Sequence, residues 1–438
     1  MGGTAWTRGR RALLAGAALT AVLVPGTAAG AAPAEPYATA PGARQVRGAD
    51  STAGAPRLAV GGAYADDLAP GERFYQVDLD DASSVYVSAV ARPAPGAEVA
   101  YGDGIDVVLM DRAGRQCGSG DRGTFGSTQP RPLTDVAVRR LQEDGDCQEA
   151  GPYYVKLERA SAPASGREPW PVELTLLREP GLATGDAPEP APSTWPSQPP
   201  VAPSGQGEPR PGGTGFNDAR ALGTGVWQDA LHPGETRFYR VPVDWGQQLS
   251  ASAELAKAPR MTKDFGYAGS GLALRLYSPV RALLGTESAT YDGKQAMAGL
   301  EKTPPVAHAN RYSTDPWVRH ARSAGWYYLA VTVDRKVGEF VADAEPLPLT
   351  LRVRVEGGTA PAPPYRDPAA AIAAGFGLAE TDREAAAEGL TPAESTAAGA
   401  RRDRMGLLAV GGIGTGSALV LGLGAWAVLA RRTRLRSG

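Results

Sequence analysis

The sequence predicts an all-β protein built from two tandem β-sandwich domains, and a set of repeated phrases is the main reason. Three phrases occur twice, in the same order and at similar spacing, which indicates a duplicated domain. They are Leu68–Leu79 and Leu231–Val243, Ala150–Val155 and Ala324–Leu329, and Pro169–Leu176 and Pro346–Leu351. The apolar runs around them are short, alternate with period two and end at Gly, Pro, Asp or Ser, as β-strands do. No amphipathic stretch of ordinary helix length interrupts them, so a sandwich is favoured.

The chain begins with the features of a secretory signal peptide, which we place at residues 1–31. Arginines precede an apolar run over residues 12–24, and small residues suited to cleavage follow. The apolar run is short for a membrane span, so cleavage is expected in preference to an uncleaved anchor. Residues 32–55 are small and polar without periodicity, and we expect them to be disordered.

Each predicted domain contains five clear strand patterns. The first domain, residues 56–180, has them at Arg73–Leu79, Val85–Val90, Ile105–Met110, Tyr153–Leu157 and Val172–Leu177. The second domain, residues 214–357, repeats the series at Arg237–Val243, Leu249–Leu255, Leu272–Tyr277, Trp326–Val333 and Leu349–Val355. A Pro-Gly turn precedes the first strand of each series, because proline and glycine supply the dihedral angles that a turn requires.

The segments between and after the domains are predicted to be extended connectors. Residues 181–213 are rich in proline, which indicates a semi-rigid linker without a core. Residues 358–404 begin with prolines and then become rich in Ala and Glu, which suggests a stalk with marginal helices. The sequence therefore predicts two separate domains displayed on a stalk.

The C-terminal part of the chain carries a predicted transmembrane helix. Residues 405–430 contain no charged side chain and exceed the roughly 20 residues that cross a bilayer core. Arginines occur in residues 431–438, which we expect to form a short cytoplasmic tail. With the signal peptide, this predicts a single-pass type I protein of the cell membrane with an extracellular ectodomain. Gly412 and Gly416 form a GxxxG pattern, a candidate for helix–helix packing.

The amino-acid composition argues against a nucleic-acid partner and indicates a bacterial origin. The formal net charge is −2, from 45 basic and 47 acidic residues, so no basic footprint points to nucleic acid. The bias toward Ala, Gly, Pro and Arg is typical of high-GC bacteria, which suggests an actinobacterium. Cys117 and Cys147 are the only cysteines. In an exported protein such a pair predicts a disulfide, which stabilises by about 3 kcal/mol in the loop-closure model.

At the repeated phrases the chain resembles the bacterial pre-peptidase C-terminal domain, a small jelly-roll-like β-sandwich of secreted proteins. The second copy carries the resemblance best, with a Pro-Gly turn followed by Phe238–Val241, Leu274–Pro279 and Gly325–Tyr328. Long insertions near residues 115–148 and 285–322 depart from that family's compact form. The resemblance implies two non-catalytic modules of a kind that includes carbohydrate-binding and protein-binding domains.

No catalytic, cofactor or metal site is predicted from the sequence. A serine hydrolase needs Ser, His and an acid that converge, and the ectodomain has no Gly-x-Ser-x-Gly motif. The three histidines lack metal-ligand spacing. Tyr312 and Trp317, in the second insertion, are the candidate ligand contacts.

Two functions remain open at this stage. The first is a non-enzymatic surface protein that binds a membrane or envelope protein partner or assembles an envelope complex. The alternative is a cell-wall glycan-binding module displayed on a membrane-anchored stalk.

Overall fold

The computed structural model describes residues 37–402 except 143–144, 185–189, 199–200, 264 and 343–345, together with residues 2, 423, 425 and 426. The predicted signal peptide, transmembrane segment and cytoplasmic tail lie almost wholly outside the described residues, and Gly412 and Gly416 lie outside them altogether. Among the helices that are described, none has both the length and the apolar character needed to cross a membrane. Strands dominate the described residues, which confirms the all-β prediction.

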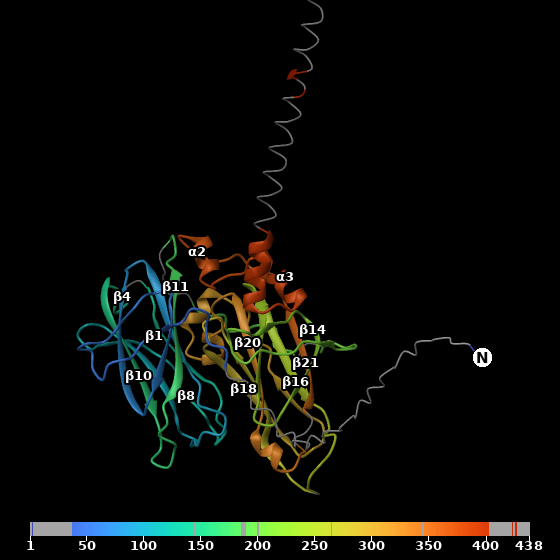
Figure 1. Ribbon diagram of the computed structural model, residues 1–438. Helices are drawn as coiled ribbons and strands as arrows, with labels where there is room; N and C mark the ends of the chain where they lie inside the picture. The colour runs from blue at the N-terminus through green and yellow to red at the C-terminus, as the bar shows by residue number, and fades with distance from the viewer. Residues whose placement is uncertain are drawn as a thin grey trace, which may run out of the picture. The chain divides into compact units, whose positions relative to one another are not determined.

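The first domain consists of two sheets packed face to face (Figure 1). Sheet A contains, in spatial order, β1 (Arg44–Gln45), β3 (Ala63–Leu68), β11 (Trp170–Pro180), β5 (Ser83–Ala91) and β9 (Leu133–Arg139). Sheet B contains β2 (Arg57–Leu58), β4 (Gly71–Leu79), β10 (Gly151–Ala160), β6 (Gly104–Met110) and β7 (Gln116–Ser119), with β8 (Gly123–Thr124) paired to β6. Inward-facing side chains alternate along β10, so that Tyr153, Val155 and Leu157 are buried in the core.

The second domain repeats this strand order position by position. Sheet C contains β12 (Glu208–Pro209), β14 (Gly225–Leu231), β21 (Leu347–Glu356), β16 (Gln248–Leu255) and β19 (Ala296–Leu300). Sheet D contains β13 (Arg220–Ala221), β15 (Thr236–Val243), β20 (Gly325–Val333), β17 (Ala268–Tyr277) and β18 (Leu283–Tyr291). The register also agrees, because Val155 lies opposite Tyr75 in one domain and Leu329 lies opposite Tyr239 in the other.

The repeated Phe-Tyr phrase anchors the same buried hydrogen bonds in both domains. The Tyr75 hydroxyl donates to an Asp66 carboxylate oxygen at 2.7 Å, and the backbone N–H of Gly48 donates to that same oxygen. In the second domain Tyr239 donates to Asp229 at 2.6 Å. Both hydrogen bonds join a strand of one sheet to a strand of the other, β3 to β4 and β14 to β15, and so link the two sheets of each sandwich.

The expectation of disorder for residues 32–55 is wrong where the structure describes them. β1 pairs in parallel with β3, and Ala49 forms an antiparallel bridge with Phe74. These contacts are made by backbone groups, so a segment without side-chain periodicity can still extend a sheet edge. The first domain therefore begins before residue 56 and includes residues 44–49.

The expected linker and stalk also belong to the folded body. Within residues 181–213, β12 joins sheet C as its edge strand, and Leu182 bridges to Tyr365. Residues 358–404 contain α2 (Pro368–Ala373) and α3 (Glu380–Glu388), which lie against the ends of strands from both domains in Figure 1. The Phe376 ring packs on Tyr86 of β5 with ring centroids 5.2 Å apart. The two domains are thus joined by packing contacts as well as by the chain between them.

The two insertions are ordered parts of the sandwiches where they are described. The first supplies β7, β8 and β9, and the second supplies β19 together with η1 (His308–Tyr312) and α1 (Pro316–Arg319). A further 3-10 turn, η2 (Arg335–Glu339), follows β20. Both insertions reach the junction between the domains, where the candidate site lies.

Candidate functional site

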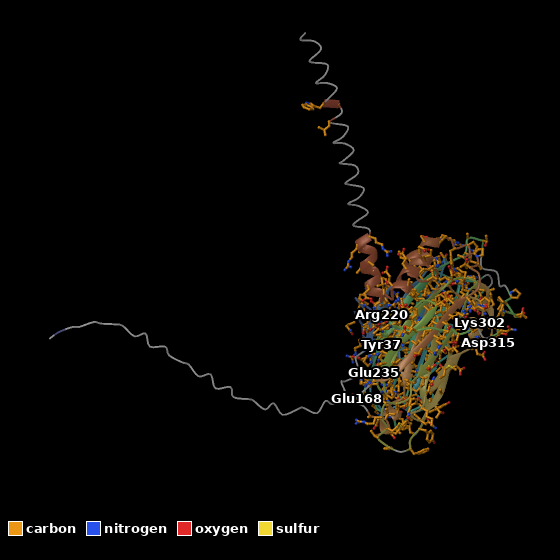
Figure 2. The ribbon with its side chains drawn as sticks, turned by 90° about the vertical axis from the view of Figure 1, so that its right-hand side faces the viewer. Tyr37, Glu168, Arg220, Glu235, Lys302 and Asp315 are labelled. Atoms are coloured by element: carbon orange, nitrogen blue, oxygen red, sulfur yellow. A yellow bond between two sulfur atoms is a disulfide. The ribbon has the colours of Figure 1, made fainter. Side chains whose placement is uncertain are left out.

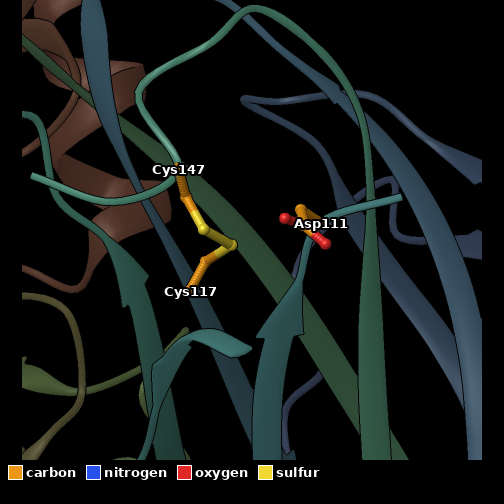
Figure 3. Close-up of side chains that lie close together, drawn as sticks. All are labelled: Asp111, Cys117 and Cys147. Carbon is orange, nitrogen blue, oxygen red and sulfur yellow. A yellow bond between two sulfur atoms is a disulfide. The ribbon is translucent and has the colours of Figure 1, made fainter. Parts of the chain in front are cut away.

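The predicted disulfide between Cys117 and Cys147 is confirmed (Figure 3). Asp111 lies beside it, and these three residues are the one group of metal-ligand type found among the described residues. Both sulfur atoms are bonded to each other and so are not thiolate ligands. The Asp111 carboxylate instead accepts hydrogen bonds from the backbone of Ala113 and Arg115, each at 2.9 Å, and closes the β6–β7 turn. This cluster is structural.

The two predicted ligand contacts, Tyr312 and Trp317, are half-buried and packed against protein. The Trp317 ring lies over Gly285 of β18, where a methyl group would collide with it. The guanidinium of Arg140, from the first domain, lies 5.6 Å from the Tyr312 ring centroid. Tyr312 thus lies at the junction between the domains, Trp317 packs within the second domain, and the two rings do not form an open stacking platform.

Sheet A is covered on both faces, and this creates the junction. Every residue of β5 is buried, although one face of a sandwich strand ordinarily meets solvent. Its outward-facing Val90 packs with Phe238 and Tyr277 of sheet D, and its outward-facing Tyr86 joins the core of the second domain. The outer face of sheet A thus lies against the outer face of sheet D.

Acidic side chains of the first domain meet basic side chains of the second across this junction. Glu179, at 1% side-chain exposure, accepts a 2.5 Å hydrogen bond from Arg311 and a 2.7 Å bond from Tyr86. Burial alone raises the pKa of Glu179, but the charge and hydrogen bond of Arg311 outweigh it and lower the pKa to about 2. Glu173, whose side chain is fully buried, pairs with Arg281 at 2.5 Å. Neither acid was predicted to have a role, because alternation along a strand does not reveal what covers its outer face.

A third cross-domain contact joins Asp121 to Arg319 and His320. One Asp121 carboxylate oxygen accepts a hydrogen bond from Arg319 at 2.5 Å, and the other accepts one from His320 Nε2 at 2.6 Å. The hydrogen bond from His320, with Arg319, holds the pKa of Asp121 well below its usual range. Burial lowers the pKa of His320 even though the Asp121 bond opposes this, so the neutral ring donates through Nε2.

A cavity of about 270 Å³ lies behind this contact, between the two domains. Asp121, His320, Asp135 and Arg131 line it. Burial raises the pKa of Asp135 to about 7, and the nearby charge of Asp106 acts in the same direction. One Asp135 oxygen is fixed at 2.7 Å from the backbone N–H of Val107, so the carboxyl group has a defined position.

A larger groove of about 540 Å³ lies next to it, and Arg131 lines both spaces. Its walls are rich in proline and come from three loops of the first domain and from the Pro-Gly turn of the second. Figure 2 shows Tyr37, Glu235 and Glu168, which line the groove, along one side of the described body. Two of the repeated phrases, the Pro-Trp-Pro of the first copy and the Pro-Gly-Glu of the second, thus meet across this groove.

Comparison with known proteins identifies no family. No family model matches the chain, and no curated protein matches it. Among solved structures, the pre-peptidase C-terminal domain of a Bacillus anthracis collagenase aligns at 13% identity over 28% of this chain and 93% of its own, with a TM-score of 0.18. A tandem pair of CBM22 domains from Paenibacillus barcinonensis aligns at 12% identity over 65% and 83%, with a TM-score of 0.18. These TM-scores are too low to carry an argument, so the sandwich architecture rests on the strand pairing above.

Proposed function

We propose that this chain is a non-enzymatic cell-surface protein whose two sandwiches act as one binding body, held outside the membrane by a single C-terminal span. The groove of about 540 Å³ between the domains carries this proposal. Concave, largely apolar sites at domain junctions are where ligands and partner segments most often bind. The buried ion pairs of the junction fix the two walls of the groove relative to each other, so it is preorganised for a partner.

The contacts of His320 favour a binding function over a catalytic one. His320 and Asp121 form the arrangement closest to a catalytic dyad in the described part of the chain. Nδ1 of His320 is buried and meets no hydrogen-bond partner among the described residues, so no hydroxyl nucleophile is poised against it. The pair is better explained as a clamp between the domains.

The partner that we propose is a membrane or envelope protein of the same cell. A crosslinking pull-down from native membranes, with the full chain as bait, tests this. The expected result is one stoichiometric membrane protein, captured by the wild type and lost with Ala94→Arg, which places a long charged side chain at an exposed position of the groove wall. Ala113→Arg, in the exposed turn at the opposite end of β6, is the matched control and should leave capture unchanged.

Other outcomes of the same experiment discriminate between the two functions. Recovery of cell-wall fragments without a protein partner favours the glycan-binding alternative and overturns the assembly proposal. Equal capture by the two arginine variants would place the partner on another surface and remove the groove from the argument.

A further inference from the structure

Arg131 is a half-buried charged side chain at the junction that has no acidic partner among the described residues. Its guanidinium donates to the backbone oxygens of Thr124 and Phe125, each at 2.9 Å. Its Nε is buried without a hydrogen-bond partner in the described part of the chain, and no carboxylate there forms an ion pair with it. Carbonyl oxygens satisfy its donors but leave its full positive charge uncompensated.

A second half-buried arginine, on sheet D, also lacks an ion pair among the described residues. Arg275 of β17 makes one long hydrogen bond, 3.4 Å to the Thr332 hydroxyl, and its Nε also lacks a partner among the described residues. Burial lowers the pKa of Arg131, and the charge of Arg275 lowers it further, so the two guanidinium groups repel each other across the junction. The charge of Arg275 therefore adds to the positive potential at Arg131.

A third arginine extends this potential along the groove. Arg92 donates to the Thr39 hydroxyl at 2.6 Å and lies 5.2 Å from the ring centroid of Tyr37. Arg92 also forms no ion pair with any described carboxylate, although Tyr37 and Arg92 both line the groove. At three other junction contacts, by contrast, a carboxylate of the first domain is paired with an arginine of the second.

The acidic groups that face the groove do not neutralise these arginines. Glu235 accepts from the backbone N–H of His232 at 2.9 Å and lies 3.7 Å from Arg237, so its charge is already engaged. Glu98 and Glu168 are exposed and belong to the mouth of the groove. Their charges are screened by solvent more strongly than those of the half-buried Arg131 and Arg275.

We propose that the groove is an anion-binding site, in which Arg131 receives the carboxylate or phosphate group of a ligand whose apolar part lies between the proline-rich walls. Arg275 and Arg92 supply further positive charge. This inference rests on the proposed binding function and names the chemistry that the groove recognises. Guanidinium groups bind carboxylates and phosphates through paired, charge-assisted hydrogen bonds, and an anion at Arg131 would relieve its repulsion with Arg275.

Titration calorimetry of the full chain in detergent micelles tests the site with three small probes. Benzoate and phenyl phosphate present the two anions on an apolar ring, and benzyl alcohol presents the ring without a charge. We expect at least one anion to bind about tenfold or more tightly than benzyl alcohol, and the preferred anion distinguishes the carboxylate from the phosphate source. Arg131→Gln should weaken that binding about tenfold, while Arg57→Gln, on the distant edge of sheet B, should not.

Several results would overturn the inference. They are binding of neither anion to the wild type, equal binding of benzyl alcohol, or an unchanged affinity in a folded Arg131→Gln protein. If Arg131→Gln does not fold, the anion affinity of Glu168→Gln tests the inference instead. Removing this exposed negative charge at the mouth of the groove should tighten anion binding and leave the fold intact. Partner capture that persists without anion binding overturns this inference alone, and anion binding without partner capture overturns only the proposed function.

Discussion

Replacing Arg311 with methionine is the most direct test of the junction between the domains. The substitution leaves Glu179 buried with the hydroxyl groups of Tyr86 and Tyr365, at 2.7 and 2.9 Å, but without a cation. Breaking a buried ion pair from one side costs about 3–5 kcal/mol. The pKa of Glu179 gives a second estimate, since lowering it from 4.5 to about 2 corresponds to about 3 kcal/mol at neutral pH.

The pH dependence of this loss has a defined sign. Because the pKa of Glu179 is lower in the folded state, its contribution is present above the unfolded value and is lost as the pH falls from about 4.5 to about 2. Without Arg311, burial raises the pKa of Glu179, so the variant regains stability as that carboxyl is protonated. The difference in unfolding free energy between wild type and Arg311→Met should therefore be largest at pH 7 and shrink toward pH 3.

Equilibrium urea unfolding, followed by tryptophan fluorescence at several pH values, measures this difference. Arg178→Met is the matched control, since Arg178 is adjacent to Glu179 and pairs with Asp80 at 3.3 Å with a side chain 52% exposed. Such a pair is worth about 0.5 kcal/mol. Adding Glu179→Gln to Arg311→Met should recover part of the loss. A loss for Arg311→Met no larger than that of the control at pH 7 would show that the Glu179–Arg311 ion pair does not stabilise the junction.

Two further predictions concern the first domain. Replacing Cys117 and Cys147 with serine should lower the free energy of unfolding by about 3 kcal/mol, and a reducing agent should have the same effect on the wild type alone. Gly120→Ala would place a methyl group against the fixed carboxylate of Asp135 and should cost about 1–3 kcal/mol by thermal melting. Gly102→Ala meets no atom and should change stability by less than about 0.5 kcal/mol, and equal costs for the two would contradict this geometry.

Local patterns were enough to predict the strands, because period-two alternation depends only on neighbouring residues. They failed where the backbone alone makes the contact, as in β1, whose two residues are both exposed yet pair with β3. They also failed for residues 358–404, where Tyr365 and Phe376 are buried within a sequence otherwise dominated by alanine. Burial of this kind depends on a surface formed by distant strands, which composition does not reveal.

The candidate site was missed for a related reason. Glu173 and Glu179 occupy outward positions of their strand, and in an isolated sandwich such positions meet water. One signal was available in Ser83–Ala91, where apolar or small residues occupy both faces, as they do in strands buried on both sides. That pattern predicts a cover over sheet A but does not identify what covers it.

The duplicated domains meet through different surfaces of the two copies. Sheet A packs against sheet D, so the contact uses a different surface from each copy, and a heterologous contact of this kind can propagate if both copies carry both surfaces. The register identifies the positions of sheet C that match the covered face of sheet A. Where sheet A has Tyr86, Val90, Thr175 and Leu177, sheet C has Ser250, Glu254, Arg352 and Arg354.

With these residues, the charges on the outer face of sheet C are paired within the second domain. Arg352 pairs with Glu254 at 2.8 Å, and Arg354 pairs with Glu356 at 2.9 Å. Glu356 stands at the position of Glu179, yet its charge is met within its own domain, so no cation from another domain is required. Charged, internally paired side chains disfavour the docking of a third sandwich, because their desolvation would not be repaid. The outer face of sheet C therefore differs in kind from that of sheet A, because its charges are paired within its own domain.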